Sequence, residues 1–139
     1  MRLNDGPPEI LLIEDNPGDV VLLRYALREK GIEYALTHYA SGQDAVDALT
    51  GQPADTRPPD AILLDLNTPK TDGFAALAKL MQMPRLAHVP IAILTSSRAH
   101  SDKHRAAIHG ARYIEKPAQL KEFVSSVGNA VREMLSSAA

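Results

Sequence analysis

The fold of this chain is decided by the stretch Ala61-Ile62-Leu63-Leu64-Asp65-Leu66-Asn67. Its apolar side chains follow one another without polar alternation, which is typical of a strand covered on both faces, as in a parallel sheet flanked by helices. Ligands bind such sheets at the carboxyl ends of the strands, and Asp65 stands at that end. A single acid in this position is more often a strand terminus or a cap for the following turn, so its function depends on the residues that join it.

The rest of the chain alternates between apolar strand patterns and helical periodicity. The predicted strands cover residues 9–13, 34–39, 60–66, 89–95 and 111–114. The predicted helices cover residues 17–30, 43–49, 74–83, 99–109 and 120–134, and prolines at 84 and 90 bracket a linker. This alternation predicts an α/β fold, a doubly wound parallel sheet. Five strands suit the flavodoxin-like (βα)5 order 2-1-3-4-5, which makes the first and third strands neighbours.

Length and composition favour a single domain, so we expect residues 1–139 to form one domain without an output domain. A net charge of -2, from 15 basic and 17 acidic residues, gives no electrostatic footprint for nucleic acid or an anionic membrane. The chain has no cysteine, which excludes disulfides and thiolate metal sites. No signal peptide or membrane-spanning apolar run is apparent. We therefore expect a cytoplasmic protein.

Three acids are expected to meet at one edge of the sheet. Glu14 and Asp15 end the first predicted strand, and the strand order puts them beside Asp65. At a separation of about 4 Å and an effective dielectric of about 20, each pair of charges repels by about 4 kcal/mol. Either their pKa values rise or a cation binds, and an oxygen-only ligand set favours Mg²⁺. Mg²⁺ keeps coordination positions open for a phosphate, so the acids indicate phosphoryl chemistry.

Two further strand ends complete the pattern. Thr95 ends the fourth predicted strand with a hydroxyl that can donate to a phosphoryl oxygen, and Lys116 follows the fifth with a cation suited to phosphate. Read singly, Thr95 is an ordinary β-branched strand residue and Lys116 a solvated charge. Read together with the acids, they predict a phosphoryl-transfer site in which an Asp is the covalent acceptor.

These residues resemble the receiver domains of bacterial two-component response regulators over nearly the whole chain. The matching motifs are residues 12–16 (LIEDN), 64–67 (LDLN) with Pro69, 72–73 (DG), 94–96 (LTS) and 113–117 (YIEKP). The resemblance implies that the protein is a signalling domain and not an enzyme in the usual sense, although it assists its own phosphorylation and dephosphorylation.

The resemblance also implies roles for the acidic residues. Asp65 is expected to accept a phosphoryl group from a sensor histidine kinase. Asp15, Asp65 and the backbone carbonyl of Asn67 are expected to hold Mg²⁺, and Glu14 is expected to assist through water. The expected cofactor is therefore Mg²⁺, and the expected partner is a kinase.

A switch is implied by the same resemblance. Thr95 and Lys116 are expected to bind the phosphoryl group, and Thr95 is expected to move toward it while Tyr113 turns inward. The surface altered would be the fourth helix, fifth strand and fifth helix, about residues 99–135. In the family the bond from this lysine to the following proline is commonly cis, so the bond between Lys116 and Pro117 is a candidate cis bond, which is consistent with the near-confinement of cis bonds to proline.

Within the family, three segments resemble the standalone regulators paired with phytochrome-type photoreceptor kinases. They are residues 14–19 (EDNPGD), 66–70 (LNTPK) and 94–97 (LTSS). This resemblance implies a homodimer through the fourth helix and fifth strand, with a phytochrome-type histidine kinase as the partner.

Other functions use similar residues. A phosphatase of the haloacid dehalogenase type also has an Asp nucleophile, a hydroxyl, a Lys and Mg²⁺, but its second catalytic acid would stand two residues after the nucleophile, where this chain has Asn67. A binding module that is never phosphorylated would not need the full set of phosphoryl-site residues. His100 and His104 have helical spacing without a nearby acid, which indicates a solvated face and not a metal site.

Overall fold

Five parallel strands form one sheet at the centre of the molecule. The computed structural model describes residues 6–66, 73–96 and 99–137. The strands within them are β1 (Glu9–Ile13), β2 (Ala35–Tyr39), β3 (Ala61–Leu64), β4 (Ile91–Thr95) and β5 (Arg112–Glu115). They are hydrogen-bonded in the order β2-β1-β3-β4-β5, so the predicted flavodoxin-like order is confirmed.

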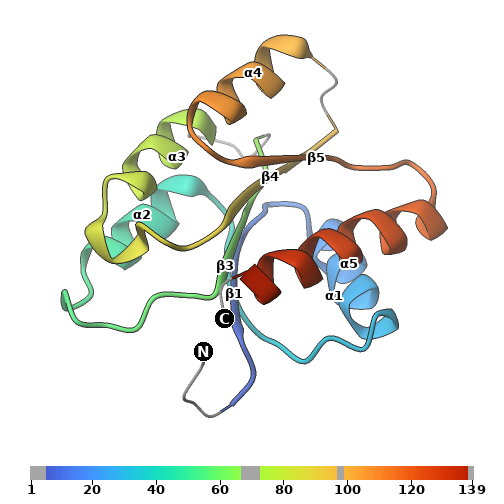
Figure 1. The fold of residues 1–139 in the computed structure, drawn as a ribbon, viewed down its shortest axis with the longest axis horizontal. Coiled ribbons are helices and arrows are strands. Elements are labelled where there is room, and N and C mark those ends of the chain that lie inside the picture. Colours follow the sequence, from blue (N-terminus) through green and yellow to red (C-terminus); the bar gives the residue numbers. More distant parts are fainter. Residues whose placement is uncertain (1–5, 67–72, 97–98, 138–139) are drawn as a thin grey trace.

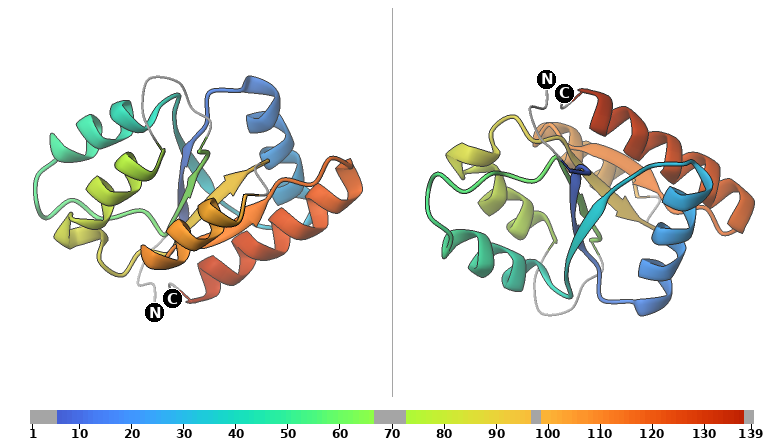
Figure 2. Two further views of the ribbon diagram at one scale, coloured as in Figure 1. Left: turned by 90° about the horizontal axis from the view of Figure 1, so that it is seen from above. Right: turned by 90° about the horizontal axis from the view of Figure 1, so that it is seen from below.

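Helices cover both faces of this sheet (Figures 1 and 2). One face carries α1 (Pro17–Glu29) and α5 (Leu120–Ser137), and the other carries α2 (Gly42–Thr50), α3 (Gly73–Met81) and α4 (His100–Ile108). None of the helices in the described part of the chain combines the length and apolarity that crossing a membrane requires.

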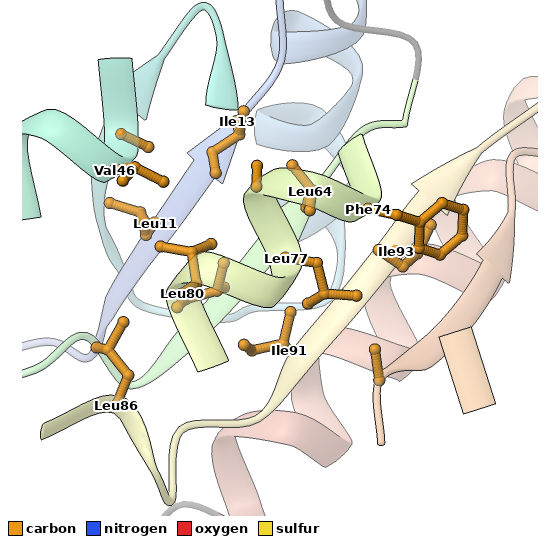
Figure 3. Packing of buried hydrophobic residues seen from close by; sticks show 14 of the residues in the cluster. Leu11, Ile13, Val46, Leu64, Phe74, Leu77, Leu80, Leu86, Ile91 and Ile93 are labelled. Carbon is orange, nitrogen blue, oxygen red and sulfur yellow. The ribbon is translucent and has the colours of Figure 1, made fainter. Parts of the chain in front are cut away.

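The three central strands, β1, β3 and β4, are apolar along most of their length because alternate side chains enter two separate cores. Figure 3 shows one core, in which Leu11 and Ile13 of β1 and Leu64 of β3 meet Leu77 and Leu80 of α3. The other residues of the same strands pack against α1 and α5. Burying each such side chain contributes roughly 1.5–3 kcal/mol. The apolar side chains of these strands on both faces of the sheet are therefore buried in the cores. The ends of the strands are left open for binding.

The helices differ in how firmly the core holds them. α3 buries five residues, whereas α4 buries only Ala106. α4 also makes contacts between cations and rings: the guanidinium of Arg105 lies 4.0 Å from the centroid of the Phe74 ring, and the Lys103 ammonium lies 5.9 Å from that of Tyr113. Such contacts contribute about 0.5–1 kcal/mol each at exposed sites. α4 is thus weakly anchored.

A short 3-10 helix, η1 (Pro84–Leu86), occupies part of the segment predicted as a linker. Pro84 fits the first helical position, where its missing N–H is not needed. Leu86 is buried in the same core as α3, and Arg85 donates a hydrogen bond of 2.9 Å to the carbonyl oxygen of Leu49 in α2. Three residues are too few to show a helical period, so the sequence pattern does not indicate this helix.

The start of α3 lies against the backbone that follows β3. A Cβ atom at Gly73 would lie 2.9 Å from both the Cα and the Cδ2 of Leu66, which is closer than real Cβ contacts. Only glycine therefore permits α3 to begin this close to the residue after Asp65.

We expect Gly73→Ala to lower the free energy of unfolding by about 1–3 kcal/mol, because the backbone at Leu66 must move to admit the methyl group. Gly51→Ala is the matched control, since a Cβ there would lie 3.5 Å from its nearest neighbour, the carbonyl oxygen of Asp47. The control should change stability by less than about 1 kcal/mol. Urea unfolding followed by circular dichroism measures both variants, and equal losses would contradict the close approach.

Candidate functional site

The site lies at the carboxyl ends of the strands, where parallel hydrogen bonding continues one residue past the sheet. The backbone N–H of Asp65 donates to the carbonyl oxygen of Ile13 at 3.0 Å. The N–H of Lys116 likewise donates to the carbonyl oxygen of Thr95 at 2.7 Å. These bonds fix the positions of Asp65 and Lys116 along the strand direction relative to the neighbouring strands.

The three acids predicted to meet are together. One carboxylate oxygen from each of Glu14, Asp15 and Asp65 lies within 4.8 Å of the other two. Glu14 and Asp65 are buried, whereas Asp15 is exposed. Carboxylate oxygens in such a group fit a hard divalent cation, because Mg²⁺ prefers oxygen ligands. Bound there, the cation would neutralise the charge that these acids bring together.

Burial raises the pKa of Glu14 to about 7, from an ordinary value of 4.5. A hydrogen bond with Asp65 and the negative charge of that residue add to this shift, while Lys116 opposes it. The backbone N–H of Asn16 donates to Glu14 Oε2 at 3.2 Å, which fixes the carboxylate. The site therefore holds an acid that is ready to exchange a proton for a cation near neutral pH.

Lys116 is the positive centre of the site. Its ammonium donates to Glu14 Oε1 at 2.9 Å, to Asp65 Oδ2 at 3.0 Å and to Asp19 Oδ2 at 2.7 Å. An ammonium has three donors, so these contacts use all of them. Burial lowers the pKa of Lys116, but the hydrogen bonds to Asp19 and Glu14 and the negative charges of Asp65 and Glu14 outweigh it and raise this pKa above its usual range. Lys116 is thus firmly cationic.

Asp19 is a site residue that the sequence analysis did not identify. It lies in the first turn of α1, where the side chain of Asn16 caps the helix by accepting from the N–H groups of Gly18, at 2.8 Å, and Asp19, at 3.3 Å. Residues 14–19 were recognised as a motif, but helix direction alone does not indicate that Asp19 reaches across to Lys116. The available signal was an acid one turn into the helix that leaves the acidic strand end.

His38 was also missed. Its Nε2 lies 2.6 Å from the backbone carbonyl oxygen of Glu14, and because a carbonyl only accepts, the ring donates. The N–H of Glu14 in turn donates to the carbonyl oxygen of Tyr39 at 3.0 Å. β2 therefore holds the backbone of Glu14 from the side opposite Asp65.

A cavity of about 500 Å³ opens over the acids and Lys116. Ser96, Pro117 and Ala118 complete its wall beside the acidic residues and Asn16. Its size admits a small anionic group beside Asp65, with room for water. The arrangement suits a phosphoryl group, which needs charge neutralisation and a nucleophile in one place.

The predicted switch residues lie at different depths. Thr95 is fully buried at the end of β4, and it does not line the cavity. Tyr113 on β5 is half-buried and packs against the core that contains α3. Tyr113 also contacts α4, since the Lys103 ammonium lies 5.9 Å from the centroid of its ring.

Asn67, an expected metal ligand, lies outside the described residues. The candidate cis bond between Lys116 and Pro117 is trans in this structure, because no peptide bond in the described segments is cis. The trans isomer is favoured by about 0.5–1 kcal/mol before proline, and the backbone here adopts it.

Known proteins share this fold and about a third of this sequence. The family model for the response regulator receiver domain matches residues 10–128. Response regulator Rcp1 of Synechocystis sp. is 34% identical over 131 residues, which cover 91% of this chain and 89% of Rcp1. The phosphorylated cyanobacterial phytochrome response regulator RcpA superposes with a TM-score of 0.85 at 31% identity, covering 96% of this chain and 98% of RcpA.

Relatives of known structure hold divalent metal. The Mn²⁺-bound form of Rcp1 has a TM-score of 0.82 at 32% identity and covers 93% of this chain and 95% of its own. The receiver domain of a sensor histidine kinase from Pseudomonas aeruginosa, with a magnesium ion coordinated in its active-site cleft, has a TM-score of 0.69 at 30% identity and covers 96% and 98%. By sequence, fold and the acidic group at its strand ends, this chain belongs to the family of response regulator receiver domains.

Proposed function

We propose that Asp65 accepts a phosphoryl group from the phosphohistidine of a sensor kinase in a Mg²⁺-dependent reaction. The observation that carries this proposal is the position of the Asp65 carboxylate, buried and hydrogen-bonded to the Lys116 ammonium at 3.0 Å beneath an open cavity. An oxygen of Asp65 attacks phosphorus, the bond between phosphorus and the histidine nitrogen breaks, and the imidazole leaves. Hydrolysis of the resulting acyl phosphate by water would return the free carboxylate.

The residues have distinct parts in this reaction. Asp15 and Asp65, with the backbone carbonyl of Asn67, would bind Mg²⁺, and Glu14 would contribute through water. Mg²⁺ would supply charge neutralisation for the phosphoryl oxygens. Lys116, which already donates to Asp65, would donate to a phosphoryl oxygen once the acceptor is modified. Glu14 is also buried and also accepts from Lys116, so the family motif at the end of β3 is what distinguishes Asp65 as the nucleophile.

The switch would run through Thr95 and Tyr113 to α4. Phosphorylation would draw Thr95 toward the new group, and Tyr113 would turn into the space released. The surface of α4, β5 and α5 would change as a result. The weak anchoring of α4 supports this route, because only Ala106 of that helix is buried.

The partner we propose is a phytochrome-type histidine kinase, which is supported by the likeness to the phytochrome response regulator RcpA. We further propose that residues 1–139 make up one receiver domain that works in the cytoplasm, where a kinase would reach it. A homodimer through α4 and β5 completes the proposal.

Phosphorylation is testable by mass spectrometry. Incubation with Mg²⁺ and a small phosphodonor should add one labile phosphoryl group to the wild-type chain and none to Asp65→Asn. Asp44→Asn is the control, because Asp44 is an exposed acid in the first turn of α2, and it should be labelled as the wild type is. Labelling of Asp65→Asn would overturn the assignment, and steady release of phosphate from many phosphoesters would favour a phosphatase.

Stability should depend on pH through Glu14. Because burial raises the pKa of folded Glu14 from 4.5 to about 7, the folded protein keeps a proton in this window that the unfolded chain has lost. The free energy of unfolding should therefore fall as pH rises from about 5 to about 7.5, by up to about 3 kcal/mol.

Urea unfolding of the metal-free protein measures this dependence, and Glu14→Gln isolates it by difference. Saturating Mg²⁺ should reduce the loss at the higher pH, because the ion binds the deprotonated acids. Identical pH profiles for the wild type and Glu14→Gln would contradict the raised pKa.

The dimer can be tested with a pair of matched surface variants. Light scattering should give the phosphorylated protein twice its 15.0 kDa chain mass. Ile108→Asp, on α4, should yield monomers, since Ile108 is 67% exposed and a charge there would oppose burial in an interface. Val21→Asp on α1, where Val21 is 64% exposed, should leave the dimer intact. A monomeric wild type in both phosphorylation states would remove the dimer.

A further inference from the structure

The Lys116 ammonium and a divalent cation require some of the same ligands. Glu14 and Asp65 belong to the group of acids whose oxygens lie within 4.8 Å of one another, and both also accept hydrogen bonds from Lys116, at 2.9 Å and 3.0 Å. A cation bound by these acids would repel the nearby ammonium. Lys116 must therefore give up part of its contact with them while staying close enough to serve Asp65.

Asp19 is the acceptor of Lys116 that lies outside this group of acids. Its Oδ2 makes the shortest of the three contacts with the ammonium, at 2.7 Å. The cap formed by Asn16 fixes the first turn of α1, so Asp19 approaches from a helix and not from a strand end. Its side chain is 28% exposed, whereas those of Glu14 and Asp65 are 2% and 5% exposed, so Asp19 holds the ammonium from the solvent side of the site.

We propose that Asp19 is a positioning residue, which holds the Lys116 ammonium on the α1 side of the cavity when a divalent cation engages Asp65 directly and Glu14 through water. The inference rests on the proposed function, since it concerns how the same site admits its metal. Without Asp19, the ammonium would have only Glu14 and Asp65 as partners among these acids, and it would compete with the cation for both. Asp19 thus lets one site hold a lysine and a divalent ion together.

An acid in the first turn of a helix also has a simpler use, because it interacts favourably with the helix dipole. Asp44 provides the comparison, since it stands in the first turn of α2, behind a Ser41 cap, on the opposite face of the sheet from α1. Both acids have the same charge and the same kind of helix position. They differ in that Asp19 contacts Lys116.

Calorimetric titration of the full chain with MgCl₂ tests the proposal. Asp19→Asn should weaken Mg²⁺ binding by about three- to tenfold. This loss is smaller than the one expected from removing a fully buried partner of a metal ligand, because Asp19 is partly exposed. Asp44→Asn should change the dissociation constant by less than about twofold. Equal dissociation constants for the wild type and Asp19→Asn, or equal losses in Asp19→Asn and Asp44→Asn, would overturn the proposal.

A double-mutant cycle separates positioning of Lys116 from a simple change of net charge. In a Lys116→Met background, Asp19→Asn should weaken Mg²⁺ binding by less than half the factor that it does in the wild type, because the side chain that it positions is gone. The same factor in both backgrounds would overturn the proposal, since a charge acting directly on the ion is additive. Circular dichroism checks folding, and Lys116→Gln replaces Lys116→Met if that variant is unfolded.

Different results would contradict the proposed function and the positioning role of Asp19. A wild-type chain that binds no Mg²⁺ would remove the proposed function, and with it the positioning role. A wild-type chain that binds Mg²⁺ and is phosphorylated, with an Asp19→Asn variant that binds Mg²⁺ equally well, would remove the positioning role alone.

Discussion

One ammonium shared by three carboxylates is the interaction on which the site depends. Glu14 and Asp65 are buried, and an uncompensated charge at such a depth costs several kcal/mol. Lys116 compensates them and also contacts Asp19, with its own side chain only 12% exposed. The site thus keeps its acids close together around one cation, although the pKa of Glu14 remains raised. A charge arriving in the cavity changes this balance directly.

The strand order explains why a lysine has this role. Lys116 follows β5, and β4 separates β5 from β3, where Asp65 stands. Strands β3 and β5 are two strand spacings apart, which is about 10 Å. Only a long side chain such as that of lysine can therefore place its charge across the end of β4. Thr95 ends β4 and is buried at that crossing. The end of β4 therefore lies between the backbone of Lys116 and the Asp65 carboxylate that its ammonium contacts.

The periodicity of the apolar residues and the residues at the strand ends were sufficient to predict the fold. They also predicted that the acids at the ends of β1 and β3 lie together. Apolar runs as dense as residues 61–64 require a sheet covered on both faces, and that requirement leaves few topologies. What could not be predicted depends on side-chain direction over short distances. Asp19 reaches Lys116 because of the rotation of α1 about its axis, and His38 reaches the backbone of Glu14 across a strand pair. The helix η1 was not predicted because it is too short to show a helical period in the sequence.

The contrast between α3 and α4 has an energetic consequence. α3 begins against the backbone of Leu66 and buries five residues, so displacing it would expose several large apolar side chains at roughly 1.5–3 kcal/mol each. Displacing α4 would expose one alanine and disturb contacts between cations and rings that are individually weak. A perturbation of a few kcal/mol near the acids is therefore more able to shift α4 than to dislodge α3.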